Sequence, residues 1–180
     1  MKIVLFNGSP REGNTKFAIE AIAKGIDENV AGAQTDIINV ENLGMSCCIG
    51  CDTCVNNGGI CIYEDDMVDV IAKVREADMI VFGSPVYWWG ITAQLKMVID
   101  RLYALSGDHG KTDKKIGLVH IGEADLDGPQ YGFISGQFKC ICGHLGWDMV
   151  FDKPISAAAL DDVKNNQQLV NELSEIWKKI

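Results

Sequence analysis

The chain has 180 residues, 47% hydrophobic and 23% charged, which is long enough for one domain with a sizeable core and cramped for two. Its net charge of −9 repels phosphate backbones and anionic lipid, so nucleic acid and membrane surfaces are poor partners. The apolar run at residues 2–6 is too short for a signal peptide, and no stretch reaches the length of a membrane span. We therefore expect a cytoplasmic protein whose 7 cysteines are reduced thiols available for metal or redox chemistry.

Short, mostly apolar runs without alternation are typical of strands buried on both faces of a parallel sheet. They lie at residues 2–7, 35–40, 78–83, 115–121 and 147–155. Amphipathic segments between them predict helices at residues 15–30, 66–77, 92–105 and 131–145. One more helix is predicted near the end of the chain from an inward stripe of Val163, Val170, Leu173, Trp177 and Ile180.

This alternation predicts an α/β fold in a single domain, residues 1–180, with helices on both faces of a doubly wound, five-stranded parallel sheet. In the strand order 2-1-3-4-5, the carboxyl ends of the first, third and fourth strands lie side by side. A ligand is therefore expected at the loops that follow these three strands.

The loop after the first strand, residues 7–15 (NGSPREGNT), opens a predicted helix, so its backbone N–H groups and hydroxyls can converge on an anion. Its glycine spacing mimics a P-loop, but Asn14 stands where that motif has its lysine, and Gly-x-Gly-x-x-Gly is absent. A single terminal phosphate is therefore a better ligand than a nucleoside triphosphate or a dinucleotide. The alternative is that Asn14 or Thr15 simply caps the helix.

The loop after the third strand, residues 83–90 (GSPVYWWG), holds three adjacent aromatic residues that would be costly to expose without a flat partner. The isoalloxazine of a flavin is such a partner, and FMN also carries a single terminal phosphate. The alternative for Trp88 and Trp89 is core packing or a subunit interface.

These two loops, with residues 92–96 (TAQLK) and 99–101 (IDR), resemble the NADPH-dependent FMN reductase family of flavodoxin-like proteins over nearly the whole chain. The resemblance implies a flavodoxin-like three-layer sandwich that binds FMN, uses NAD(P)H as cosubstrate and forms a homodimer or homotetramer. It implies that the phosphate is bound by Ser9, Arg11, Asn14 and Thr15, and the ring system by Pro85, Val86, Tyr87 and Trp88.

The loop after the fourth strand, residues 120–129, gives a weaker indication. Gly122 would let the backbone approach the ring edge, and Glu123 adjoins it. The acidic residues of this loop also fit solvated surface charges. His120 is interpreted as structural, because no nucleophile and base accompany it. No catalytic side chain is predicted, since FMN itself would carry the chemistry.

A cysteine-rich loop at residues 44–64 contains the spacing Cys48-x2-Cys51-x2-Cys54-x6-Cys61. Such compact spacing suits a [4Fe–4S] cluster better than zinc, whose second ligand pair usually lies a dozen or more residues away. The pattern is similar to that of iron–sulfur flavoproteins, a branch of the same family. The alternative is free thiols or a redox pair. Cys140 and Cys142 are interpreted as core packing.

Three functions follow from these features. The first is an FMN-dependent NAD(P)H oxidoreductase that reduces a flavin, a quinone or another small acceptor. The second is an electron carrier in which a ferredoxin-like donor reduces a cluster and then FMN. The third is a flavin-binding redox sensor without turnover.

Overall fold

The computed structural model describes residues 1–110 and 113–180. Its sheet has 5 strands in the order β2-β1-β3-β4-β5, and every neighbouring pair is parallel. The strands are β1 (Lys2–Asn7), β2 (Gln34–Asn39), β3 (Met79–Pro85), β4 (Lys115–Gly122) and β5 (Asp148–Ser156). The predicted fold class and strand order are therefore confirmed, and the predicted strand ranges hold to within two residues.

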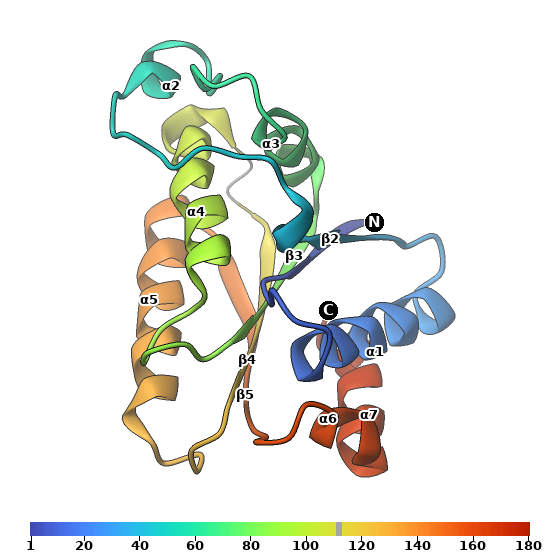
Figure 1. Cartoon of the computed structure of the whole chain (residues 1–180). Coiled ribbons are helices and arrows are strands. Elements are labelled where there is room, and N and C mark those ends of the chain that lie inside the picture. Colours follow the sequence, from blue (N-terminus) through green and yellow to red (C-terminus); the bar gives the residue numbers. More distant parts are fainter. Residues whose placement is uncertain (111–112) are drawn as a thin grey trace.

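Helices cover both faces of this sheet (Figure 1). On one face lie α3 (Met67–Glu76), α4 (Ala93–Arg101) and α5 (Pro129–Leu145), and on the other lie α1 (Asn14–Asn29), α6 (Asp162–Asn165) and α7 (Gln167–Ser174). The remaining helical segments are short: α2 (Thr53–Asn56), η1 (Val40–Asn42), η2 (Leu102–Leu105), η3 (Gly107–His109) and η4 (Ile176–Lys179). Among the described residues, no helix is both long and apolar enough to cross a membrane.

Each face of the sheet has its own hydrophobic core, because successive strand residues point to opposite faces. On the α4 and α5 face, Phe6 stacks on Phe82 with ring centroids 5.3 Å apart, and Phe82 packs against Phe138 at 5.2 Å. On the α1 face, Leu5 and Val81 belong to the other hydrophobic core. Strands buried on both sides explain why the sequence runs are apolar without alternation.

Two predictions about helices were wrong. The helix predicted near the end of the chain is broken into α6, α7 and η4. Asn166 separates α6 from α7, because it leaves the helical conformation and its side chain caps α7 by accepting a hydrogen bond from the Leu169 N–H at 3.1 Å. Cys140 does not pack in the core: it is exposed on α5, whereas Cys142 is buried. Ile176, which the predicted stripe missed, is buried.

Candidate cofactor site

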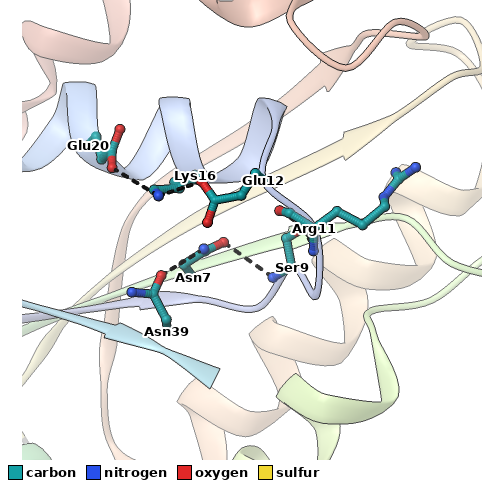
Figure 2. Close-up of polar contacts among 7 residues, drawn as sticks. All are labelled: Asn7, Ser9, Arg11, Glu12, Lys16, Glu20 and Asn39. Atoms are coloured by element: carbon teal, nitrogen blue, oxygen red, sulfur yellow. Dashed lines mark hydrogen bonds and ion pairs between the residues drawn. The ribbon is translucent and has the colours of Figure 1, made fainter. Parts of the chain in front are cut away.

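The loop after β1 is held by its own side chains (Figure 2). The side-chain amide of Asn7 donates to Asn39 Oδ1 at 2.9 Å, and Asn7 Oδ1 accepts the Ser9 N–H at 3.2 Å. Ser9 Oγ accepts the Arg11 N–H at 3.1 Å and donates to the Arg11 carbonyl at 2.9 Å. These local bonds turn the chain sharply from the strand into α1, which brings the loop's backbone to the edge of the sheet.

A second set of bonds joins this loop to the loop after β3. The Gly8 N–H donates to the Gly83 carbonyl at 2.8 Å, and a Cβ at Gly8 would lie 2.7 Å from that carbonyl oxygen. The fully buried Thr92 donates its hydroxyl to the Gly8 carbonyl at 2.6 Å and accepts the Leu95 N–H at 3.2 Å, which caps α4. The first two predicted loops are therefore fixed to one another.

A cavity of about 200 Å³ lies between these loops at the carboxyl edge of the sheet. Its lining includes most of the residues that the sequence predicted for a flavin nucleotide: Ser9, Arg11, Asn14, Thr15, Pro85, Val86, Tyr87, Gly122 and Glu123. The first turn of α1, which begins at the cavity, has no side-chain cap among the described residues. Its N–H groups and the positive end of the helix dipole are thus available to an anion, and a terminal phosphate fits this wall.

Arg11 and Tyr87 close the cavity from opposite loops. The exposed Arg11 guanidinium lies 5.8 Å from the centre of the Tyr87 ring, and Figure 2 shows the side chain extending away from α1. A second cavity of about 330 Å³ continues the site through Val86, Gly122 and Glu123 to Trp88 and Trp89. The predicted ring-binding residue Trp88 lines only this outer cavity, and its side chain is 91% exposed.

The two tryptophans form the tip of a tight turn. Tyr87 and Gly90 exchange backbone hydrogen bonds of 2.8 and 3.0 Å, and Trp88 and Trp89 between them have φ angles of 49° and 64°. A turn with two positive φ angles normally uses asparagine or glycine. Each bulky residue in this conformation costs roughly 1–2 kcal/mol. Backbone strain of this kind collects at ligand sites, which supports a functional reading of the aromatic loop.

Asn14, which lines the cavity, also contacts the segment after β5. Its side-chain amide donates to the Ala159 carbonyl at 2.6 Å, and its Oδ1 accepts the Val163 N–H at 2.9 Å. These contacts place residues 157–160 as a further wall of the cavity, which the sequence analysis missed. The segment consists of three alanines and a leucine, so its side chains carry no chemistry that a sequence pattern could reveal.

The fourth predicted loop contributes Gly122 and Glu123 to both cavities, while Glu123, Asp125 and Asp127 are exposed, as solvated charges would be. His120 is fully buried, with Nε2 2.8 Å from Asp152 Oδ1. Burial alone would raise the pKa of Asp152, but hydrogen bonds, first of all with His120, leave it lowered. This contact between a buried histidine and a partly exposed carboxylate agrees with the structural interpretation of His120.

The cysteine-rich loop lies beyond the carboxyl end of α4, at the opposite end of that helix from the aromatic loop (Figure 1). Cys48 and Cys51 are exposed, Cys61 is partly buried and Cys54 is buried. Burial raises the pKa of Cys54. A hydrogen bond with Thr53 lowers the pKa of Cys51.

The donor set of this loop, four thiols in 14 residues, matches the ligands of an iron–sulfur cluster. Within residues 1–110 and 113–180, no three Cys, His, Asp or Glu side chains are already gathered as a metal site. The assignment of Cys48, Cys51, Cys54 and Cys61 therefore stays a prediction. Beside the loop, a cavity of about 720 Å³ runs between α4 and α5, and its lining combines apolar residues with charged and polar ones such as Asp52, Lys96 and Asp100.

The sheet order defines a flavodoxin-like protein, and its cavity lies at the carboxyl edge of the sheet, where proteins of this class bind their ligands. Residues 1–131 match the family model for NADPH-dependent FMN reductases, and the chain belongs to this family. An azoreductase from Bacillus anthracis shares the fold, with a TM-score of 0.69 at 16% identity over 100% of both chains.

Two curated relatives are iron–sulfur flavoproteins. One from Methanocaldococcus jannaschii is 37% identical over 131 residues, 72% of this chain and 66% of that protein. Another from Archaeoglobus fulgidus is 39% identical over 101 residues, 56% of this chain and 48% of that protein. The matches thus span about half to two thirds of the length of these relatives.

Proposed function

We propose that the chain is an FMN-dependent NAD(P)H oxidoreductase that reduces a flavin, a quinone or another small acceptor. One observation carries this proposal: the 200 Å³ cavity joins the uncapped start of α1 to the aromatic loop at the switch point of the sheet. Family membership agrees with it.

Each wall of the cavity has a distinct role in this proposal. Ser9, Thr15 and the first N–H groups of α1 would bind the phosphate, and Arg11 would add a positive charge at the mouth. Pro85, Val86 and Tyr87 would contact the ring system from one side, and the backbone at Gly122 from the other. When bound, FMN supplies the redox chemistry, taking a hydride from NAD(P)H and passing two electrons to the acceptor.

FMN titration of the apoprotein, followed by flavin fluorescence, tests the site. Replacing Arg11 with alanine should weaken FMN binding about tenfold, as expected for loss of a charge-assisted hydrogen bond worth about 1.5 kcal/mol. The matched control is Lys16→Gln, which removes a charge that pairs with Glu12 in the preceding loop and with Glu20 on α1 (Figure 2). Equal affinities for the two variants would remove Arg11 from the phosphate site, and no FMN binding by the native chain would refute the proposed function.

The second candidate function is an electron carrier in which a cluster bound by Cys48, Cys51, Cys54 and Cys61 exchanges electrons with FMN. The spacing of the four cysteines favours it, and so do the names of the relatives. Iron and sulfide are measured on protein purified without oxygen. Flavin bleaching by a reduced ferredoxin but not by NADPH or NADH would select the carrier over the NAD(P)H-dependent enzyme. If neither ferredoxin nor NADPH or NADH reduces the bound flavin, the redox sensor is the remaining candidate function.

We also propose that the chain acts as a homodimer or homotetramer. Trp88 and Trp89, 91% and 52% exposed, form an aromatic edge beside the cofactor cavity that a second copy would cover. Sedimentation of the native chain and of Trp88→Ser tests this, and a monomeric native chain would refute it.

A further inference from the structure

The stem of the cysteine-rich loop is closed by one side chain from α4, Arg101. Its guanidinium makes a two-pronged contact with Asp65, at 2.8 and 2.9 Å, and also donates to the Ser46 carbonyl at 2.9 Å. Ser46 precedes the first cysteine of the loop, and Asp65 follows the last. Asp65 also accepts the Ser46 N–H at 2.9 Å, so both ends of the loop meet at this ion pair.

This ion pair is buried, with 1% of the Arg101 side chain and 15% of the Asp65 side chain exposed. A buried ion pair is weak evidence for stability, because desolvation of both groups offsets much of their attraction. Its position at the base of a loop that carries five cysteines therefore indicates a role beyond holding α4 in place.

One nitrogen of Arg101 makes none of these contacts. Its Nε is buried and has no hydrogen-bond acceptor within the part of the chain that the structure describes. The Tyr63 ring packs 5.1 Å from the guanidinium carbon, and Cys61 lies only two residues before Tyr63, so this contact brings the segment that contains Cys61 beside Arg101. Burial alone would lower the pKa of Arg101, but Asp65 and the nearby Cys61 sulfur leave it raised.

A fixed cation near cluster sulfurs favours the more negative, reduced state of a cluster. Hydrogen bonds to the sulfurs and net charge are the means by which a protein sets the reduction potential of an iron–sulfur centre. A guanidinium remains charged at any working pH and presents its donors in a rigid plane, so its effect is permanent.

We propose that Arg101 is a positioning residue for the cysteine-rich loop: its fork closes the loop at Ser46 and Asp65, and its Nε–H is the donor for a sulfur at Cys61. This inference rests on the second proposed function for the sulfur contact, whereas loop closure does not depend on it. Arg101 thereby raises the reduction potential of the bound cluster.

The loop-closing role is tested on the apoprotein by hydrogen–deuterium exchange. In Arg101→Gln, residues 46–65 should exchange at least tenfold faster than in the native chain, while residues 7–15 remain unchanged. Arg101→Lys keeps the charge but loses the planar fork, so it should also exchange faster. Unchanged exchange at residues 46–65 in both variants would overturn the closing role.

The sulfur contact is tested by redox titration of protein loaded with iron and sulfide. The cluster potential should become more negative in Arg101→Gln and less negative in Asp65→Asn, which leaves the cation without its counter-ion. The control is Arg75→Gln, because Arg75 binds the backbone of the loop at Gly59, at 3.2 Å, and should leave the potential unchanged.

Opposite shifts of the cluster potential in Arg101→Gln and Asp65→Asn cannot come from a merely structural role, because loss of structure would shift the potential of both variants in the same direction. Equal potentials in all variants would overturn the sulfur contact. A native chain that takes up no iron would also overturn it, together with the electron-carrier function, while the exchange measurement would still decide the loop-closing role. If Arg101→Gln does not fold, Asp65→Asn and Arg101→Lys carry both tests.

Discussion

Replacing Thr92 with valine keeps the shape of a fully buried side chain and removes the hydroxyl that joins two parts of the cofactor site. The change deletes the cap of α4, where the hydroxyl accepts the Leu95 N–H, which costs about 0.5–2 kcal/mol. It also leaves the buried Gly8 carbonyl without its 2.6 Å partner, which costs about 1–3 kcal/mol. Because one hydroxyl serves both bonds, we expect a total loss of about 2–3 kcal/mol in the free energy of unfolding.

Urea denaturation of the apoprotein measures this loss without the stabilising effect of bound cofactor. With a slope of about 2 kcal/mol per molar urea, the midpoint should fall by about 1–1.5 M. The control is Thr92→Ser, which keeps the hydroxyl and loses one buried methyl, worth about 1 kcal/mol. FMN affinity should fall in the valine variant only, because Gly8 adjoins Ser9. A valine variant as stable as the serine variant would refute the reasoning.

Three further predictions concern other parts of the molecule. The double change Trp88→Asn and Trp89→Gly should stabilise the apoprotein by roughly 2–4 kcal/mol and raise its urea midpoint, because it relieves the strain of two bulky residues at positive φ; a lower midpoint would contradict the strain. The hydrogen bond with Arg101 lowers the pKa of Asp65 in the folded chain below its ordinary value of 3.8. The ionised Asp65 therefore stabilises the fold fully above about pH 3.8, and this stabilisation is lost as the pH falls through the pKa of the folded chain. Native protein should therefore lose more stability than Asp65→Asn between about pH 4 and pH 2, and parallel acid unfolding curves would argue against this. Burial raises the pKa of Cys142 to about 11 while Cys140 is exposed, so iodoacetamide at pH 8 should label Cys140 first, as peptide mass spectrometry would show; equal rates would be the contrary result.

The sequence predicted those parts of the fold that depend on local pattern. Strands such as residues 2–7 are apolar on both faces, and only a sheet covered by two helical layers buries such residues. The switch point between β1 and β3 follows from the strand order, so the loops that carry Ser9 and Tyr87 could be placed in one site before the structure was known.

The parts that could not be predicted depend on tertiary contacts of ordinary residues. The position of Asn14 in the sequence indicates a phosphate ligand or a cap, but it does not reveal that the side chain also binds residues 159 and 163, nearly 150 positions away. Such a contact leaves no local pattern, and neither does the alanine-rich wall that it positions. Cys140 was assigned to the core because cysteine is usually buried, whereas its place on α5 turns it toward solvent.

Helix α4 connects the two candidate redox sites and explains why they respond to different residues. Thr92 at its amino end holds the FMN loops, and Arg101 at its carboxyl end holds the cysteine-rich loop. The nine residues from Ala93 to Arg101 span about 13 Å at 1.5 Å per residue. Buried Leu95, Val98 and Ile99 fix the helix to the core between these ends. The hydroxyl of Thr92 and the guanidinium of Arg101 therefore act on separate loops through one rigid element, so the variants at each end probe the two sites independently.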